Sequence, residues 1–184
     1  MPTVHGDFRL ISYTQKSTGE EHLAMVKGEW TEDDAVLVRV HSSCLTGDVF
    51  GSCRCDCGPQ LHEALQQISD ARWGILLYLR QEGRGIGLIN KLRAYALQDQ
   101  GFDTVDANTR LGFAIDARDF SVASRMLTLL GQDRIRLLTN NPEKVARIAA
   151  EGVEVIERVP HKLPPNPHNA RYLDTKRDRT GHAL

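Results

Sequence analysis

The first part of the chain carries short apolar runs with the character of β-strands. Runs at residues 7–13 and 22–28 are followed by residues 35–42, where β-branched side chains are dense enough for a buried strand that ends near His41. A cysteine-bearing segment, residues 44–58, comes directly after this strand. These patterns predict a strand-rich N-terminal half.

Helical spacing appears next, over residues 59–72. Apolar side chains recur at Leu61, Leu65 and Ile68, which lie on one face of a helix. Pro59 is typical of a first helical position because its fixed φ suits the first turn. The segment therefore predicts an amphipathic helix.

Strands and helices alternate through the rest of the chain. The expected elements are a strand at 73–80, a glycine-rich loop at 81–87, a helix at 88–101 closed by Gly101, a helix at 119–131 with Asp119 as N-cap and Gly131 as its stop, a strand at 134–140, a helix at 141–152 with Asn141 as cap and Pro142 in its first turn, and a strand at 153–159. Residues 102–118 are less regular. This order predicts an α+β fold, a single mixed domain with βα units in its C-terminal half.

We place the catalytic domain at residues 1–160 and a tail at residues 161–184. The tail is rich in proline, asparagine and charge, so we expect it to lie over the surface or to be partly mobile.

Composition limits the classes of partner. With 184 residues and 41% apolar composition, the chain can bury one core without disulfides. Its 23 Lys and Arg residues nearly balance 24 Asp and Glu residues, so no global positive field favours a nucleic acid. The N-terminus carries no basic leader with an apolar core, and no stretch approaches the roughly 18 apolar residues of a membrane span. We expect a cytoplasmic protein that binds no membrane.

All four cysteines of the chain lie between residues 44 and 57. In a reducing compartment such a cluster favours metal ligands or catalytic groups over disulfides. An extended backbone would point Cys53, Cys55 and Cys57 to one face, but their convergence on one ion would need a bend. A set of Cys44 with two of the others is easier to build, and it would leave zinc a position for water. A closed four-cysteine structural site and chance buried thiols remain alternatives, whereas the H-x-E and P-C-x-x-C motifs of zinc deaminases are absent.

Two loops have the setting of anion sites, between a strand and a helix N-terminus. The first, "RQEGRGIGL" at residues 80–88, is neither a dinucleotide fingerprint nor a P-loop. Its Arg80 and Arg84 flank Glu82, which offers two guanidiniums for phosphate or base and one carboxylate for a donor. A surface turn with a local ion pair is the alternative.

The second loop, "LTNNPEKV" at residues 138–145, places Thr139 and Lys144 within reach of a phosphate. Ordinary helix capping explains Asn141 and Pro142 equally well.

In these segments the chain resembles the GTP cyclohydrolase II family. The matching stretches occur in family order from about residue 39 to 145: "RVHSSCLTGDVFGSCRCDCGPQL", "LRQEGRGIGLINKLRAYALQDQGFDTVDAN", "LGFAIDARDF" and "LLTNNPEKV". The family's C-x10-C-x-C zinc pattern falls on Cys44, Cys55 and Cys57. The resemblance implies that these thiolates hold one Zn²⁺ per subunit and that Cys53 is a bystander.

The resemblance also implies roles for other residues. The implied GTP-binding residues are Arg39, Val40, His41, Ser42, Ser43, Gln60, Glu82, Gly83, Arg84, Thr104, Thr139 and Lys144. Ser43 stands where the family commonly has an acidic residue. Asp116 is implied as proton acceptor, Arg118 as the proposed nucleophile of the triphosphate step, and Tyr95 as an active-site residue. The residues alone would place Tyr95 in the core and pair Asp116 with Arg118 as a capping ion pair.

The implied activity is zinc-dependent hydrolysis of GTP in riboflavin biosynthesis. The guanine imidazole ring would open at C8, with release of formate and pyrophosphate and formation of a diaminopyrimidine nucleotide. Mg²⁺ would accompany the triphosphate, and the family is typically homodimeric. Alternatives are a variant that stops at the formamidopyrimidine and a zinc-stabilised nucleotide-binding module without turnover. Without the extra domain that makes the four-carbon riboflavin precursor, we expect one activity.

Overall fold

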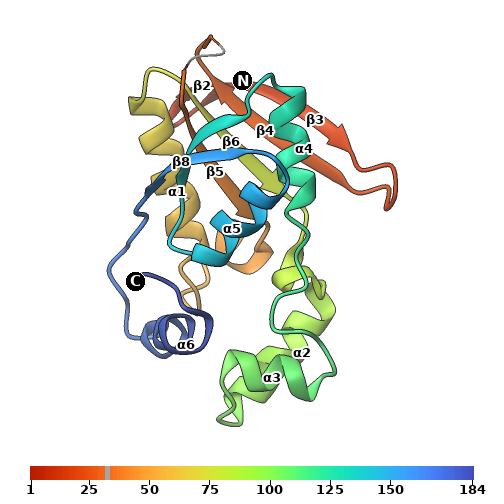
Figure 1. The fold of residues 1–184 in the computed structure, drawn as a ribbon. Coiled ribbons are helices and arrows are strands. Elements are labelled where there is room, and N and C mark those ends of the chain that lie inside the picture. Colours follow the sequence, from red (N-terminus) through yellow and green to blue (C-terminus); the bar gives the residue numbers. More distant parts are fainter. Residues whose placement is uncertain (32–33) are drawn as a thin grey trace.

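A mixed six-stranded sheet in the order β3-β4-β6-β5-β7-β8 forms the centre of the computed structural model, which describes residues 1–31 and 34–184 (Figure 1). Its strands are β3 (Arg9–Thr14), β4 (Glu21–Lys27), β5 (Val36–Ser42), β6 (Gly74–Leu79), β7 (Arg134–Leu138) and β8 (Glu154–Val159). A separate short hairpin joins β1 (Pro2–Thr3) and β2 (Gly6–Asp7). The α+β prediction is confirmed.

The order of the parallel strands determines where a ligand can bind. β5 pairs in parallel with β6 on one side and with β7 on the other, and β7 pairs in parallel with β8. The chain therefore leaves β5 toward one neighbour and later returns to its other side. In such sheets the crevice outside the carboxyl ends of the strands, where the connections diverge, is the usual ligand site.

Helices cover both faces of the sheet. α1 (Cys57–Asp70) packs on one face, where Ile68 lies in a core cluster with Leu37 and Leu76. α4 (Ser121–Leu129) and α5 (Pro142–Ala150) pack on the other face, with Met126 and Ile148 in a second cluster that includes Val38. Because successive strand side chains point to opposite faces, β5 feeds both clusters and is buried on both sides.

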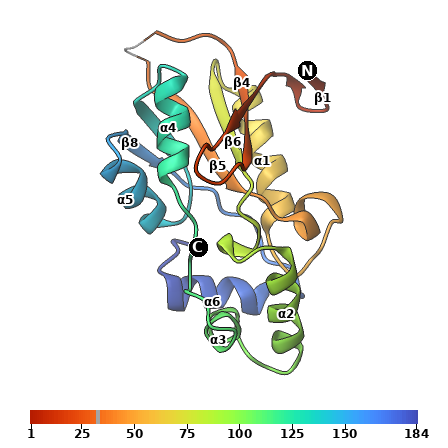
Figure 2. The same ribbon diagram turned by 90° about the vertical axis from the view of Figure 1, so that its right-hand side faces the viewer.

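The remaining helices lie beyond the carboxyl edge of the sheet. α2 (Leu88–Asp99), α3 (Thr104–Arg110) and α6 (Ala170–Thr180) lie together there in both views (Figure 1 and Figure 2). Two short turns complete the described structure, a π-helical turn at Leu45–Val49 (η1) and a 3₁₀ turn at Glu82–Gly85 (η2). Within residues 1–31 and 34–184, no helix combines the length and apolar character needed to span a membrane.

The element types predicted from periodicity are present, with shifted ends and two additional helices. α1 begins at Cys57, so Pro59 is its third residue. α4 begins at Ser121, and Asp119 accepts a hydrogen bond from the Ser121 N–H without being the cap residue itself. α3 and α6 fall in segments that carried no helical signal, because their side chains are mostly polar and form no apolar stripe.

Candidate functional site

One pocket collects most of the residues that the sequence singled out. It opens at the carboxyl ends of β5, β6 and β7, and α1, α2, α3 and α6 also contribute to its walls. The predicted residues that line it are Arg39, His41, Ser42, Ser43, Cys44, Cys55, Cys57, Gln60, Glu82, Gly83, Arg84, Tyr95, Thr104, Arg118, Thr139 and Lys144. Val40 and Asp116 do not line it. The Val40 side chain lies in the core, and Asp116 lies behind Arg118.

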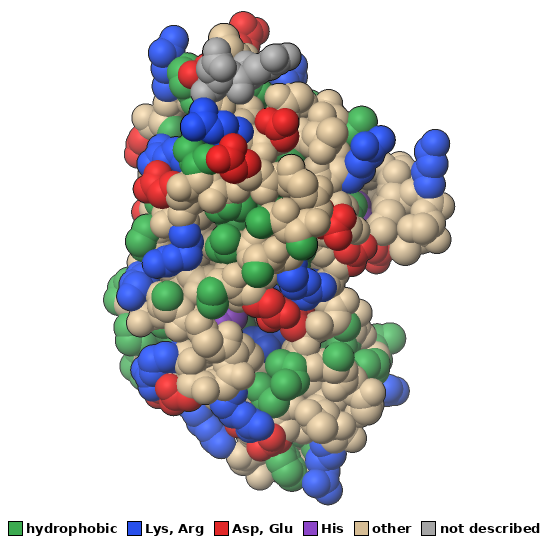
Figure 3. All heavy atoms as spheres, in the orientation of Figure 1, with side chains coloured by type: hydrophobic (Ala, Val, Ile, Leu, Met, Phe, Trp, Pro, Cys, Tyr) green, Lys and Arg blue, Asp and Glu red, His purple; other side chains and the backbone are tan. Residues whose placement is uncertain are grey.

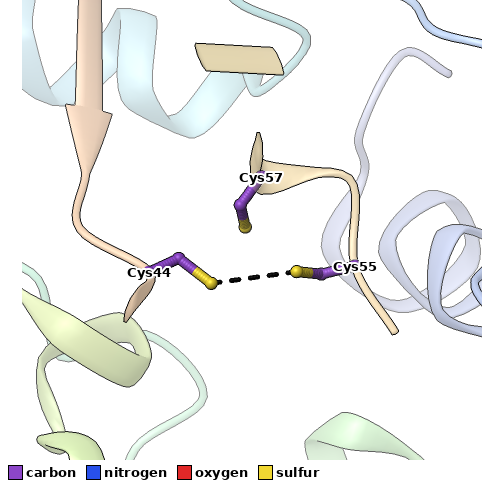
Figure 4. A group of neighbouring side chains, drawn as sticks. All are labelled: Cys44, Cys55 and Cys57. Atoms are coloured by element: carbon purple, nitrogen blue, oxygen red, sulfur yellow. Dashed lines mark hydrogen bonds between the residues drawn. The ribbon is translucent and has the colours of Figure 1, made fainter. Parts of the chain in front are cut away.

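Three thiols converge at the base of this pocket (Figure 4). The sulfurs of Cys44, Cys55 and Cys57 all lie within 4.8 Å of one another, and the Cys44 and Cys55 sulfurs are 3.8 Å apart. Tetrahedral zinc with Zn–S bonds of about 2.3 Å requires sulfurs roughly 3.8 Å apart. Cys53 is exposed and outside this group. The donor set therefore fits a metal ion held by three thiolates.

Two glycines allow the cysteine segments to approach each other. A Cβ on Gly47, in η1, would lie 3.0 Å from the Cys55 sulfur and 3.1 Å from the Cys44 sulfur. A Cβ on Gly58, in the first turn of α1, would lie 2.3 Å from the Gly47 carbonyl oxygen. The backbone of η1 thus occupies the space beside the thiols that a larger residue would need.

The Asp48 carboxylate fixes the cysteine loop to the sheet. It accepts hydrogen bonds from the Cys44 N–H at 2.9 Å and the Tyr78 hydroxyl at 2.8 Å, and His41 Nε2 lies 3.0 Å away. Burial lowers the pKa of His41, although the hydrogen bond with Asp48 opposes this shift. These hydrogen bonds therefore hold Cys44 close to the end of β5.

Lys91 joins the thiols to the glycine-rich loop. Its Nζ donates to the Cys44 sulfur at 3.0 Å and to Glu82 Oε1 at 2.7 Å, and Glu82 Oε2 accepts from the Leu45 N–H at 2.7 Å. Burial alone would lower the pKa of Lys91, but Glu82 and Cys44 outweigh it and raise this pKa. Sequence reasoning missed Lys91. Its position four residues before Tyr95 on the predicted helix was the available signal, because residues at that spacing share a face.

Two buried cations lie at the end of β5. Burial lowers the pKa of Arg39 to about 10, and burial together with the charges of Arg39 and Arg118 lowers the pKa of Lys144 well below its usual value. The Lys144 Nζ donates to the Val40 carbonyl at 2.8 Å, while Arg39 Nε is buried without a hydrogen-bond partner in the described structure. A bound anion would raise these lowered pKa values and could accept a hydrogen bond from Arg39 Nε.

The glycine-rich loop presents a third cation. Gly83 and Arg84 both adopt left-handed backbone conformations, with φ of 61° and 60°. That conformation is uncommon for a residue with a side chain, and such strain concentrates at functional sites. The Arg84 guanidinium makes no hydrogen bond or ion pair with the residues the structure describes, so it is free to bind a ligand.

Asp116 and Arg118 form the ion pair expected from the residues alone. Arg118 Nε donates to Asp116 Oδ1 at 2.8 Å, and a second guanidinium nitrogen donates to Oδ2. Burial opposes both charges, but the pair raises the pKa of Arg118 and lowers the pKa of Asp116. The guanidinium at the pocket wall therefore stays protonated.

Unpartnered buried atoms also face the pocket. Ser42 Oγ, His41 Nδ1 and Gln81 Oε1 have no hydrogen-bond partner among the described residues, and all three residues line the pocket. Buried polar atoms are normally satisfied, so these atoms indicate a polar ligand. On the face seen in Figure 3, by contrast, acidic and basic side chains are interspersed. The pocket lining differs from that face, because among the described residues it includes Arg39, Arg84, Lys91, Arg118, Lys144 and Lys176 but only one acidic residue, Glu82.

Three further lining residues come from the C-terminal segment, which the sequence did not connect with the site. These residues are Tyr172, Lys176 and His182. No local pattern in the sequence indicated them.

Comparison with known proteins gives a consistent result. A family model described as GTP cyclohydrolase II matches residues 1–160. The "Riboflavin biosynthesis protein RibBA" of Cytophaga hutchinsonii is 58% identical over all 184 residues, and the chain covers 45% of that protein. The proteins of the same name from Bacillus cereus strain AH187 and Parabacteroides distasonis are 57% and 52% identical over the whole chain. The chain thus spans somewhat less than half of the length of these relatives.

Proposed function

Because this chain belongs to the GTP cyclohydrolase II family, we propose that it hydrolyses GTP, opening the guanine imidazole ring at C8 and releasing formate and pyrophosphate. The product would be the diaminopyrimidine nucleotide that begins riboflavin biosynthesis. The observation that carries the proposal is the set of three converging thiols in a pocket lined by cationic side chains and by buried polar atoms that have no partner in the described structure.

Cys44, Cys55 and Cys57 would hold one Zn²⁺ per subunit. When bound, the ion would supply Lewis-acid activation of water. The Lys91 ammonium would offset part of the negative charge that three thiolates concentrate in the site. Its second bond would keep the Glu82 carboxylate beside the thiols.

Tyr95 would transfer or hold a proton. Its hydroxyl lies 3.3 Å from Thr46 Oγ1, on the wall of the pocket beside the thiols. Burial raises the pKa of Tyr95, so the hydroxyl keeps its proton at neutral pH. We assign it to orienting or protonating the attacked base, which Tyr95→Phe tests through the rate of formate release.

Glu82 would read guanine. One oxygen of its carboxylate already accepts from Lys91 and from the Gly83 N–H, whereas Oε2 accepts only from the Leu45 N–H. Each carboxylate oxygen has two acceptor sites, so Oε2 can still accept a guanine N–H. Glu82→Gln would then reduce the preference for GTP over ATP.

Arg84, Lys144 and Arg118 would bind the triphosphate, and Mg²⁺ accompanying the triphosphate would offset more of its negative charge. Because Asp116 keeps Arg118 protonated, we assign Arg118 to electrostatic stabilisation of the leaving pyrophosphate in preference to nucleophilic attack. Asp116 would orient that guanidinium. Trapping of a guanylylated protein would contradict this assignment.

The deciding experiment is incubation of the purified protein with GTP and Mg²⁺, with and without a zinc chelator. Formate, pyrophosphate and the nucleotide product are measured together. We expect all three with zinc and no formate with the chelator. A formamidopyrimidine product would instead indicate a reaction that stops after ring opening, and the absence of turnover by metal-loaded protein would reduce the function to nucleotide binding. Light scattering would test the homodimer that the family resemblance implies.

A further inference from the structure

The C-terminal segment forms one wall of the pocket, well away in sequence from the loops described above. Tyr172 and Lys176 come from α6, and His182 comes from the residues just after it. The Ala183 N–H donates to the Asn140 carbonyl at 2.9 Å, which ties the end of the chain to the loop after β7. The segment thus belongs to the pocket lining and is attached to the loop after β7.

Lys176 makes the one buried ion pair that links α6 to the cysteine segment in the described structure. Its Nζ lies 2.7 Å from Asp56 Oδ1, and the two side chains are 11% and 6% exposed. Burial alone would lower the Lys176 pKa, but nearby Tyr172 and Asp56 raise it, so the ammonium stays charged. The Tyr172 ring centroid lies 4.6 Å from the same Nζ, a cation–π distance.

The ion pair continues into residues assigned to substrate binding. Asp56 Oδ2 accepts from Gln60 Nε2 at 2.6 Å, and Gln60 Oε1 accepts from an Arg39 guanidinium nitrogen at 2.6 Å. Arg39 in turn donates to the Leu138 carbonyl at 3.0 Å. These hydrogen bonds connect Lys176 with Arg39 through Asp56 and Gln60, and such a chain of bonds helps to hold its members in one arrangement.

We propose that Lys176 is a positioning residue for nucleotide binding, acting through Asp56 on Gln60 and Arg39 and holding Tyr172 of α6 against the bound nucleotide. This inference rests on the proposed function, and it makes residues 170–182 part of the substrate site. It assigns Lys176 no part in the chemical step, so its loss should affect KM for GTP much more than kcat.

The test compares four variants of the full chain, each loaded with zinc. Lys176→Met should raise KM for GTP about tenfold, the loss of roughly one charge-assisted hydrogen bond, with little change in kcat and in zinc per chain. Lys176→Arg should restore most of the affinity because it keeps the charge near Asp56. The Asp56→Asn/Lys176→Met double variant removes both buried charges, so it should fold even if the single variant does not, and it should keep the raised KM. Arg177→Met is the matched control, because Arg177 is exposed and pairs only with Asp174 and Asp178 of its own helix.

A wild-type KM in Lys176→Met or in the double variant would overturn the proposal. So would a loss of zinc in proportion to activity, which would reduce Lys176 to support of the metal site. If the wild-type protein releases no formate, the proposed function fails, and the inference is then judged by equilibrium dialysis of guanosine α,β-methylene triphosphate with the same variants. Equal binding by wild type and Lys176→Met would overturn it there.

Discussion

Replacement of Lys91 by methionine tests the arrangement at the centre of the site. Methionine keeps most of the side-chain length and removes the ammonium, so the packing of this α2 side chain against its neighbours changes little. The ammonium is the partner of both Glu82 and Cys44, and the Lys91 and Glu82 side chains are 10% and 16% exposed. The change therefore leaves a nearly buried carboxylate without its counter-charge.

The expected size follows from this burial. Removal of one partner of a buried ion pair costs about 3–5 kcal/mol, because the remaining charge is uncompensated. Glu82 keeps the Leu45 and Gly83 N–H groups and borders the pocket, so we expect the lower end, about 3 kcal/mol. Loss of the N–H···S bond should also weaken zinc binding, by about 10- to 100-fold if it resembles other contacts that support metal ligands.

Two measurements separate these effects. Urea unfolding of zinc-free protein in reducing buffer gives the free energy of unfolding, and competition with a chromogenic chelator gives the zinc affinity. Arg93→Met, on the exposed side of the same helix, is the control. Addition of Glu82→Gln to Lys91→Met should recover part of the lost stability. A stability loss below about 1 kcal/mol together with unchanged zinc affinity would refute the reasoning, because an exposed ion pair is worth no more than that.

Of the three other predictions, two concern the same pocket and the third concerns buried His161, whose Nε2 lies 2.8 Å from the Gln60 carbonyl oxygen. Gly47→Ala should lower the zinc content per chain while far-UV circular dichroism stays unchanged, because the added Cβ would lie 3.0 Å from the Cys55 sulfur; full zinc content would contradict this. Binding of guanosine α,β-methylene triphosphate to zinc-free protein should raise the lowered pKa of Lys144, because phosphate favours the charged ammonium; calorimetry over a range of pH, in buffers of different ionisation enthalpy, should show proton uptake where Lys144 of the free protein loses its proton, and this uptake should be absent in Lys144→Met. Burial and the charge of Arg39 lower the pKa of His161 to about 4. Because the unfolded chain binds this proton near pH 6.5, His161 contributes about 3 kcal/mol to the free energy of unfolding above pH 6.5, and this contribution is lost as the pH falls toward 4. Urea unfolding of zinc-free protein should show a shallower loss over that range in His161→Gln, and equal slopes would exclude His161 as the cause.

The predictable parts of the fold rest on local signals. A few adjacent residues are enough to predict the β-branched run of β5 and the cap of α5. In that cap the Asn141 side chain accepts a hydrogen bond from the Glu143 N–H. Ligand counting and zinc chemistry favoured Cys44 with two of the other three cysteines, and the family resemblance then selected Cys55 and Cys57. The family resemblance supplied Tyr95, Asp116 and the nucleotide-binding residues outside the two loops, whereas the residues alone would have placed Tyr95 in the core and Asp116 in a capping ion pair.

The missed features depend on contacts between distant residues. Lys91 meets Cys44 across 47 positions of sequence, and Lys176 meets Asp56 across 120. α6 is so polar that nothing in its sequence distinguishes it from a surface tail, and its place is set by a buried ion pair with a loop on the other side of the pocket. Such pairs follow from the order of β6, β5 and β7 in the sheet, which the sequence pattern left open.

The net charge of the whole chain does not indicate the local charge of the pocket. A net charge of −1 suggests indifference to anions, yet Arg39 and Lys144 are both buried, and the charge of Arg39 adds to burial in lowering the pKa of Lys144. The ion pairs of Lys91 with Glu82 and of Arg118 with Asp116 neutralise two other cations, while Arg84 has no such partner among the described residues. The cations without carboxylate partners are thus the ones at the ends of β5 and β7 and in the glycine-rich loop, where a triphosphate would lie. Their repulsion disfavours the empty pocket, and a bound polyanion would remove it, so part of the affinity for a nucleotide is already present in the arrangement of the free protein.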